Sequence, residues 1–486
     1  MRYLLGIDVG TTGTKSALYS TDGTLIEKRC QKYPMDYPKQ GWAEQDPEDW
    51  WNAIVSTVLP MAAAHREDIT AMSLSTQGGC LVLLDSNFSP IYRAVSWMDT
   101  RASETVSSLR ERISIGELYR TSGWPVMNGL NLPMICWFRE KMPDLLRQAR
   151  YFSSTIDYLN HKLTGKFCID HTNLALTGFL DLETKGLSRR TLEAAEIDEE
   201  NIANVVPSGA PIGTLCREAC DILGLRPDVT VVSGAHDQYC ANIGAGAVQE
   251  GSCVLDAGTS WVLLAVSGSP YFSDEKLHEG QGLWGTVFPG IHPLEGKYGL
   301  MTVVPFGGNS LSLFRDTLGR GKSIEAITDE ACGVQPGCGG LSFVPVLSSG
   351  SGGGAFIGID TAHTIAHYAR AVIEGVALAN RYNFEILKDS GLNIEKVTMV
   401  GGGAKNRVWP QVVADVLGIP VEIPGQKDPE CLGAAILAGV GAGLYSSIDE
   451  AVSMFHDSRE TIEPDPANME LYERIYRKFI SVGGSL

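Results

Sequence analysis

The sequence lacks a long hydrophobic run. Its longest uncharged glycine-rich segment, residues 431–445, is too short and carries side chains too small to span a bilayer. The N-terminal segment MRYLLGIDVGTTGTK has neither the long apolar core nor the small-residue cleavage site of a secretory signal peptide. These absences predict a cytoplasmic protein without a membrane partner.

The sequence also lacks an excess of positive charge. Its 486 residues carry a formal net charge of −18 at pH 7. Nucleic acids and anionic membranes are bound through basic patches, so this balance argues against both as partners. A nucleotide is still compatible with an acidic protein, because backbone N–H groups and Mg²⁺ supply local positive charge.

The eleven cysteines form no disulfide framework and no zinc-ligand spacing. We therefore expect reduced, mostly buried thiols. His363 and His367 lie four residues apart on an expected helix but lack the glutamate of a zincin motif. They are interpreted as surface or capping histidines rather than metal ligands.

A short strand–turn–strand pattern opens the chain. Residues 3–9 are typical of a buried strand, and the runs 15–19 and 24–32 predict two further strands of an antiparallel meander. The first turn contains Gly10, Thr11 and Thr12, and Asp8 lies two residues before Gly10. Glycines allow backbone N–H groups to approach phosphate oxygens, and threonine hydroxyls add donors. A plain glycine hairpin is the alternative interpretation.

The same pattern recurs roughly half a chain length later. Asp256-Ala257-Gly258-Thr259 follows the apolar run 252–255, and a second strand-like run covers 261–266. Two such hairpins at this spacing predict two similar α/β halves that face each other with a nucleotide between them. Because the length exceeds that of one compact core, two or more domains are expected in any case.

Near the middle of the chain, a lone acid follows an apolar run. Residues 229–232 predict a buried strand, Ser233-Gly234-Ala235 turns it, and Asp237 opens a small-residue helix that extends to Gly246. The acid either caps that helix or meets an acceptor hydroxyl at the hinge between two lobes. Its place beside a glycine turn, just before the second hairpin, favours the second interpretation.

A glycine-rich turn lies in the second half. The strand 396–400 leads into Gly401-Gly402-Gly403-Ala404, and a helix is expected from Asn406 to Leu417. This order favours close approach of the backbone to a ligand, with a tight packing turn as the alternative.

Other elements are predicted from capping and breaker residues. They are a helix from Pro47 capped by Asp46, strands at 69–76 and 80–85, a mostly helical region over 102–225, a helix through Asp316, a flexible loop at 348–354, a helix 362–389 capped by Asp360, a strand at 419–423, and helices 429–441 and 466–482.

Over essentially its whole length the chain resembles the FGGY carbohydrate kinases, and within them the xylulose-kinase-like branch. The segments that carry the resemblance are Asp8–Thr12, GWAEQDPEDWW at 41–51, SWMDTR at 96–101, GAHDQ at 234–238, DAGTS at 256–260, the run from 354 to Glu374, and GGGAKNRVWPQVVADVLGIPV at 401–421.

The resemblance implies an α/β fold with two actin-like, ribonuclease H-like domains flanking a central cleft for ATP and a sugar. The expected domains are 1–246, which binds the sugar and supplies the base, and 247–486, which binds ATP. A homodimer is also expected.

The resemblance further implies a role for each matching residue. The implied roles are Asp237 as catalytic base; Gln77, Gly78 and Gln238 as substrate contacts; Asp8 near Mg²⁺; Gly10, Thr11, Thr12 and Lys15 near the transferred phosphate; Gly258 and Thr259 at the phosphates from the other lobe; and Gly402, Gly403 and Asn406 around the adenosine, with Gly308 nearby.

Three segments depart from the pattern of this branch. Gly78, Gly79 and Cys80 stand where Met-His-Gly is usual, SSGSGGG replaces a charged loop, and Met134 replaces a lysine. The resemblance implies a ketopentose such as xylulose as the expected acceptor, and the departure at residues 78–80 leaves another ketose, a polyol or a sugar acid such as gluconate as the alternative. A sugar sensor without catalysis and an actin- or chaperone-like ATPase are the competing classes.

Overall fold

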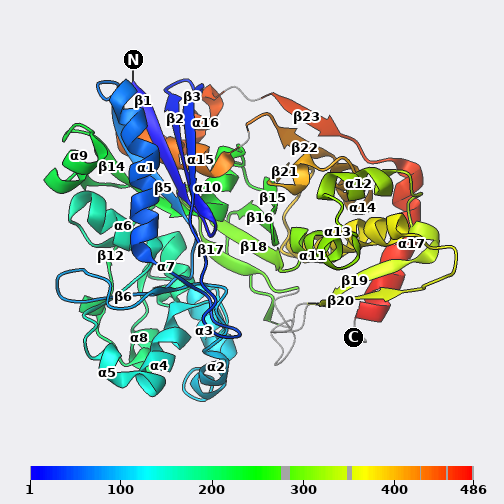
Figure 1. Ribbon diagram of the computed structural model, residues 1–486, viewed down its shortest axis with the longest axis horizontal. Coiled ribbons are helices and arrows are strands. Elements are labelled where there is room, and N and C mark those ends of the chain that lie inside the picture. The colour runs from blue at the N-terminus through cyan, green and yellow to red at the C-terminus, as the bar shows by residue number, and fades with distance from the viewer. Residues whose placement is uncertain (1, 275–284, 347–352, 427, 456–457, 484–486) are drawn as a thin grey trace. The chain divides into compact units, whose positions relative to one another are not determined.

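The computed structural model describes residues 2–274, 285–346, 353–426, 428–455 and 458–483 (Figure 1). Within these ranges no helix combines the length and the apolar character needed to cross a membrane. The chain forms two packing units, which are described separately. The first unit contains Met1–Val248, Pro289–Tyr298 and Asp428–His456, and the second contains Gln249–Phe288, Gly299–Lys427 and Asp457–Leu486.

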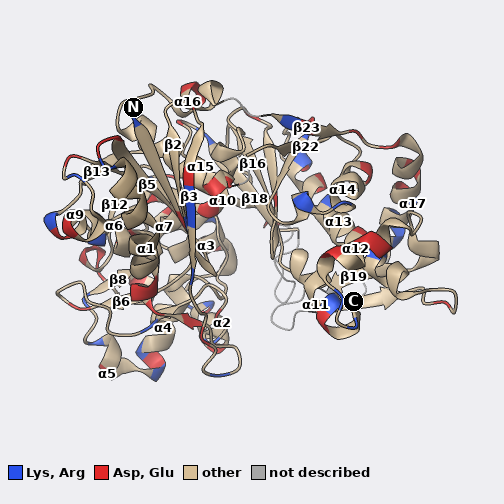
Figure 2. Cartoon of the chain, turned by 45° about the horizontal axis from the view of Figure 1, so that its top comes forward, with Lys and Arg blue, Asp and Glu red and all other residues tan. Residues whose placement is uncertain are grey.

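The first unit is built on a six-stranded sheet in the order β13-β14-β5-β1-β2-β3. Its strands are β1 (Tyr3–Val9), β2 (Gly13–Ser20), β3 (Leu25–Lys32), β5 (Ile69–Thr76), β13 (Pro211–Thr214) and β14 (Thr230–His236). The predicted antiparallel meander of β1, β2 and β3 is confirmed, and β5 and β14 continue the sheet in parallel. Every residue of β1 is buried, whereas β3 lies at the sheet edge and is mostly exposed. Figure 2 colours its lysines and arginine blue. A charged edge discourages pairing with a further strand.

Two helices of the first unit pack against each other, and the later of the two in the chain also packs against β1. They are α10 (Asp237–Gly244) and α15 (Pro429–Gly441). A Cβ atom at Gly6 would lie 1.9 Å from the carbonyl oxygen of Cys431, and one at Gly433 would lie 2.0 Å from the carbonyl oxygen of Cys240. Only glycine fits at such approaches, so these residues set how closely α15 lies on the sheet.

The other helices of the first unit follow the expected capping signals where these are present. Asp46 accepts a hydrogen bond from the amide of Glu48 at 3.0 Å, and Pro47 is the first residue of α1 (Pro47–His65), as predicted. The remaining helices are α2 (Ser103–Leu109), α3 (Ile115–Ser122), α4 (Asn131–Lys141), α5 (Pro143–Leu146), α6 (Thr155–Thr164), α7 (His171–Thr177), α8 (Arg189–Ala195), α9 (Arg217–Leu223) and α16 (Ile448–Met454). Short strands outside the main sheet are β4 (Glu44–Gln45), β6 (Val82–Leu84), β7 (Ala94–Val95), β8 (Tyr151–Ser153), β9 (Cys168–Asp170), β10 (Leu180–Asp181), β11 (Gly186–Leu187) and β12 (Asn204–Val206).

The second unit repeats the same strand arrangement. Six strands of its sheet lie in the order β18-β16-β15-β21-β22-β23, which matches the order β3-β2-β1-β5-β14-β13 of the first unit. They are β15 (Cys253–Ala257), β16 (Trp261–Ser267), β18 (Tyr298–Val304), β21 (Val397–Val400), β22 (Val421–Pro424) and β23 (Arg459–Ile462). As in the first unit, β15 pairs antiparallel with the strand after its turn and parallel with a strand from much later in the chain. The predicted repeat of two similar α/β halves is therefore confirmed.

Helices and a hairpin surround this second sheet. They are α11 (Gly308–Leu318), α12 (Ile324–Cys332), α13 (Ile365–Asp389), α14 (Trp409–Leu417), α17 (Pro466–Gly483), β19 (Ser342–Val346) and β20 (Gly353–Ile357). Helix α13 contributes many of the core residues, including Val372, Ile373 and Val376. Its length and amphipathic pattern made it predictable from sequence.

One capping prediction for the second unit is wrong, and one loop prediction lies partly outside the described residues. Helix α13 is capped not by Asp360 but by Thr364, whose extended backbone and reciprocal bonds with His367 form a capping box. Asp360 instead accepts the amide of Ala362 at 2.9 Å in a separate turn. The loop predicted at 348–354 falls outside the described residues up to 352, and its last two residues belong to β20.

The cysteine prediction is confirmed, because all eleven cysteines lie in the described ranges and each is a free thiol.

Candidate active site

The carboxyl ends of three parallel strands meet at one edge of the first unit's sheet. The strand register places Asp8 of β1 beside Ser75 of β5, and Thr76 of β5 beside His236 of β14. The hydroxyl of Ser75 donates to Oδ1 of Asp8 at 2.9 Å. In open α/β sheets, ligands bind outside the carboxyl ends of the strands. This edge, which also leads into Asp237, is therefore the candidate acceptor site.

Asp237 reaches this edge because β14 lies unusually close to β5. A Cβ atom at Gly234 would lie 1.6 Å from the carbonyl oxygen of Leu74, so the bulge in β14 at this point requires glycine. Helix α10 then begins at Asp237 itself, and His236 occupies the capping position without a side-chain capping bond. Asp237 is therefore the first residue of the helix rather than the residue at the capping position. Its carboxylate is 29% exposed, so solvent and small solutes reach it.

The candidate acceptor site combines carboxylates with the ammonium group of Lys15. Nζ of Lys15 on β2 lies 3.3 Å from Oδ2 of Asp8 and 3.5 Å from Oε2 of Glu430 at the start of α15. Burial raises the pKa of Asp8, and the negative charge of Asp237 raises it further against the lowering effect of Lys15. Burial also raises the pKa of Glu430 to about 7, with Asp8 adding to the effect. The site therefore favours an additional cation.

The first glycine turn is held by side chains from other elements. The phenol of Tyr33 donates to the carbonyl oxygen of Gly10 at 2.5 Å, and Nε1 of Trp97 donates to Oγ1 of Thr11 at 3.2 Å. Thr12, at the tip of the turn, is exposed. The turn is thus fixed from behind, while its outer face stays accessible.

Gln77 is buried, and its side chain binds Gln45. Nε2 of Gln77 donates to Oε1 of Gln45 at 2.9 Å, and Nε2 of Gln45 donates to the carbonyl oxygen of Thr11 at 2.8 Å. Gln77 is only 2% exposed, so it links the end of β5 to the first turn. Sequence reasoning placed Gln77 and Gly78 at this edge, but not Gln45 or Trp97, although both lie in segments that carry the family resemblance.

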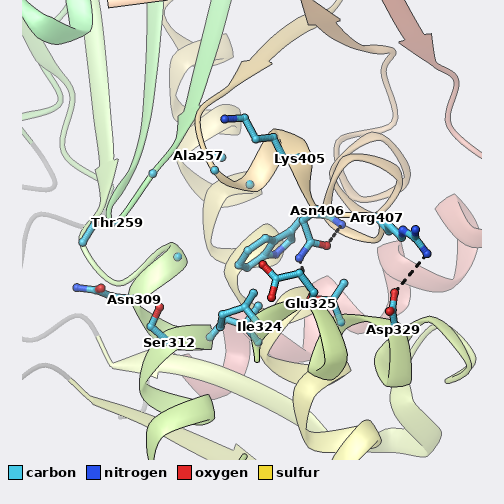
Figure 3. A pocket seen from close by; sticks show the side chains of 17 residues that line it. Ala257, Thr259, Asn309, Ser312, Ile324, Glu325, Asp329, Lys405, Asn406 and Arg407 are labelled. Carbon is cyan, nitrogen blue, oxygen red and sulfur yellow. Dashed lines mark hydrogen bonds and ion pairs between the residues drawn. The ribbon is translucent and has the colours of Figure 1, made fainter. Parts of the chain in front are cut away.

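The second unit contains a pocket of about 650 Å³ between three glycine turns. The parallel register of β15 and β21, with Asp256 beside Val400, brings the turns after both strands to the same end of the sheet. The amide of Gly308 donates to the carbonyl oxygen of Gly258 at 3.1 Å, which adds the start of α11. All six residues predicted for this half line the pocket: Gly258, Thr259, Gly308, Gly402, Gly403 and Asn406 (Figure 3).

Asn406 organises one wall of this pocket. Its Oδ1 accepts from the amides of Val408 and Trp409, at 2.9 Å and 3.1 Å, and its Nδ2 donates to Oγ1 of Thr328 at 3.0 Å. The predicted helix start at Asn406 is wrong, because the side chain binds the first amides of α14 and the helix begins at Trp409. Asn406 thus joins α14 to α12 across the pocket (Figure 3).

Helix α12 supplies a charged part of the pocket that sequence reasoning missed. Glu325 and Asp329 of α12 line it together with Lys405 and Arg407, and Arg407 lies 3.4 Å from Asp329. These acids occur in an ordinary amphipathic helix pattern, so no local signal distinguished them from solvated surface residues.

The structure thus groups the predicted residues into two sets. Those of the first half lie at the sheet edge of the first unit, and those of the second half line the pocket of the second unit. Gln238 follows Asp237 in α10, and Gly78 follows Gln77 directly after β5.

Known proteins resemble the whole chain. The xylulose kinase of Lactococcus lactis subsp. lactis (strain IL1403) is 31% identical over 490 residues, covering 98% of this chain and 95% of the relative. The gluconokinase of Bacillus subtilis (strain 168) is 26% identical, covering 93% of this chain and 90% of the relative.

Solved structures give the same architecture. The ligand-bound xylulose kinase from Lactobacillus acidophilus superposes with a TM-score of 0.92 at 24% identity, covering 100% of this chain and 98% of that chain. The xylulose kinase from Rhodospirillum rubrum superposes with a TM-score of 0.89 at 26% identity, covering 100% and 99%. The predicted α/β fold with two actin-like domains is confirmed by this likeness.

Two family models account for most of the sequence. The N-terminal domain of the FGGY family of carbohydrate kinases matches residues 3–244, and the C-terminal domain of the same family matches residues 253–442. The chain therefore belongs to the FGGY family of carbohydrate kinases.

Proposed function

We propose that this kinase transfers the γ-phosphoryl group of ATP to a hydroxyl of a small ketose, a ketopentose such as xylulose in the first instance, with Asp237 as the base. One observation carries the proposal: a partly exposed carboxylate stands at the carboxyl ends of three parallel strands, beside the turn that follows Asp8. The similarity to xylulose kinases supports the ketopentose. The similarity to gluconokinases supports a sugar acid as the second candidate.

The pocket of the second unit is proposed as the nucleotide site. Its volume suits a nucleotide. The turn at Gly258 and Thr259 offers backbone N–H groups and a hydroxyl for phosphate oxygens. Gly402, Gly403 and Asn406 line the same pocket and are proposed to contact the adenosine. Residues 247–486 would accordingly bind ATP, and residues 1–246 the sugar.

The acidic cluster around Asp8 fits Mg²⁺ bound as the magnesium salt of the nucleotide. Burial and mutual repulsion raise the pKa of Asp8 and Glu430, so a second cation beside Lys15 would be stabilised. Within the described part of the chain no three acidic, histidine or cysteine side chains form a complete metal site. Asp8 would therefore hold the ion together with water and phosphate oxygens, as Mg²⁺ prefers. The ion supplies neutralisation of the phosphate charge.

Asp237 would orient the acceptor hydroxyl and accept its proton as the bond to phosphorus forms. Phosphoryl transfer has a loose transition state, so positioning and charge stabilisation contribute more than strong basicity. Backbone N–H groups of the glycine turns and the ammonium of Lys15 would stabilise charge on the equatorial oxygens. Water exclusion during transfer would limit hydrolysis of ATP.

The replacement of Asp237 by asparagine tests this assignment. Asp237→Asn is expected to abolish sugar-dependent ADP release while leaving ATP affinity within a few-fold of the wild type, because the nucleotide contacts lie elsewhere. Asp144→Asn, at a carboxylate that is 89% exposed, is the matched control and is expected to remain active. Substantial sugar-dependent turnover in Asp237→Asn would sink the proposal.

A panel of acceptors distinguishes the competing functions. ADP release is measured with pentuloses, hexuloses, polyols and aldonates, and without any of them. A sugar sensor would release no ADP with any acceptor, and an actin-like ATPase would release it equally without one. Gluconate-dependent release without activity on xylulose would favour the second candidate.

We also propose that the enzyme acts in the cytoplasm as a homodimer. Sedimentation of the purified protein would test the oligomeric state directly.

A further inference from the structure

The imidazole of His236 lies between the candidate base and a glycine. Its Nε2 is 3.0 Å from Oδ1 of Asp237. A Cβ atom at Gly78 would lie 2.9 Å from Cδ2 and 3.2 Å from Nε2 of the same ring, and 2.0 Å from Cδ1 of Leu176. The ring and the leucine methyl therefore occupy the volume that a side chain at position 78 would need.

The glycine at position 78 is required by space rather than by backbone conformation. The glycines with positive φ include Gly79 but not Gly78. Any L-residue could therefore adopt the backbone at position 78, and only the neighbouring side chains oppose one. Gly78, in the turn after β5, and His236, at the end of β14, are thus complementary in size: the glycine leaves the space that the imidazole occupies.

His236 is fixed on its other side by a buried network. Its backbone amide donates to Oγ1 of Thr172 at 2.7 Å. The hydroxyl of Thr172 donates to the carboxylate of Asp170, which also accepts the amide of Thr172 at 2.8 Å at the start of α7. The imidazole side chain is only 11% exposed. Its position is thereby determined by α7 and by the space beside Gly78.

The imidazole of His236 is neutral, and only one of its two tautomers suits the neighbouring carboxylate. Burial lowers the pKa of His236 to about 4, so one ring nitrogen carries a hydrogen and the other accepts. Nδ1 is buried without a hydrogen-bond partner among the described residues. Nε2 lies 3.0 Å from Oδ1 of Asp237, which is within reach in distance but is not aligned as a regular hydrogen bond. A lone pair on Nε2 would repel the carboxylate, so the hydrogen belongs on Nε2.

We propose that His236 is a positioning residue for Asp237. Its Nε2–H holds one carboxylate oxygen, so that the other is directed at the acceptor hydroxyl, and Gly78 makes the room that this arrangement needs. The inference rests on the proposed role of Asp237 as the base. It concerns a pair of residues, Gly78 and His236, that act as one unit.

Two substitutions of His236 separate a polar role from a packing role. His236→Leu keeps much of the volume and loses the N–H, whereas His236→Gln keeps an N–H that can reach the carboxylate. We expect His236→Leu to lower kcat by about 10- to 100-fold, the usual effect of a misplaced catalytic group, with KM for ATP unchanged. His236→Gln should recover most of that loss at equal thermal stability. Equal kcat in His236→Leu and wild type, or no recovery in His236→Gln, would overturn the proposal.

Gly78→Ala perturbs the same contact without changing the imidazole. The added methyl group pushes the ring or Leu176, so kcat should fall by a similar factor. The kcat of the double variant Gly78→Ala/His236→Leu should be no lower than that of the poorer single variant, because both changes disrupt the same arrangement of His236 beside Asp237. Gly116→Ala, where an added Cβ meets nothing within 4 Å, is the control. Fully additive losses in the double variant would contradict the idea of one unit.

Failure of this inference is distinguishable from failure of the proposed function. If the wild type releases no sugar-dependent ADP, the proposed function fails. If the wild type is active, Asp237→Asn is inactive and His236→Leu is fully active, only the role of His236 fails. The Gly78→Ala measurement decides the matter should His236→Leu not fold, because that variant keeps the native histidine.

Discussion

Asn406 gives a prediction in which stability and nucleotide affinity separate. In Asn406→Ala the amides of Val408 and Trp409 lose their shared acceptor, which costs about 1 kcal/mol as at other helix starts. The bond to Thr328 is lost as well, for about 1 kcal/mol more. The expected loss of unfolding free energy in the second unit is therefore about 2 kcal/mol.

Asn406→Asp is the informative partner variant. Its carboxylate keeps the acceptor for both amides and adds favourable charge at the helix start. The hydroxyl of Thr328 can donate to the second carboxylate oxygen, so the expected loss is below about 1 kcal/mol. ATP affinity should nevertheless fall several-fold, because a new negative charge lines the pocket proposed for the nucleotide.

Chemical unfolding followed by tryptophan fluorescence and calorimetric titration with a non-hydrolysable ATP analogue measure the two quantities. Asn393→Ala is the control in the same unit, since its side chain donates to the exposed Glu395. Wild-type stability in Asn406→Ala would refute the role of Asn406 at the helix start. Wild-type affinity in Asn406→Asp would refute its place beside the nucleotide.

Two further predictions concern buried charge. Burial lowers the pKa of His292 from 6.5 to about 3. In this buried position its Nδ1 accepts the amide of Leu294, and its Nε2 lies 3.0 Å from Oδ1 of Asn242. Between these two pKa values the unfolded chain binds more protons than the folded chain, so the neutral His292 stabilises the fold fully above pH 6.5 and less as the pH falls. From pH 7 to 5 the wild type should therefore lose about 2 kcal/mol more unfolding free energy than His292→Gln, as measured by urea unfolding. Glu374→Ala should cost about 3–5 kcal/mol in the same assay, because it leaves the buried Arg370 guanidinium, now 2.7 Å from Oε1 of Glu374, without its carboxylate. Glu374→Gln should cost less, and identical curves for the wild type and either variant would contradict the corresponding prediction.

Features set by neighbouring residues were predictable from sequence. The strand–turn–strand hairpins at Asp8 and Asp256 depend on glycines and alternating apolar residues within a few positions, and both occur as predicted. The small-residue helix at 429–441 was likewise predicted with its observed bounds. In each case, local conformation and burial favour the same structure.

Features set by distant residues were not predictable. The reason for glycine at position 78 lies in His236, a residue on another strand, and the acidic wall of the pocket lies on α12. The start of α14 was misplaced because Asn406 is compatible with both a helix interior and a turn, and only the contact with Thr328 decides between them. Sequence patterns report which residues are buried, but not which partners they meet.

The close packing of α15 against β1 has a consequence for biosynthesis. The ribosome makes β1 first and α15 only after the intervening chain, because Gly6 and Gly433 are separated by most of the sequence. The sheet that carries Asp8 therefore emerges with its α15-binding face uncovered and stays so until residue 441 has left the exit tunnel. A nascent chain truncated after residue 246 would expose that apolar face to chaperones rather than form a finished domain.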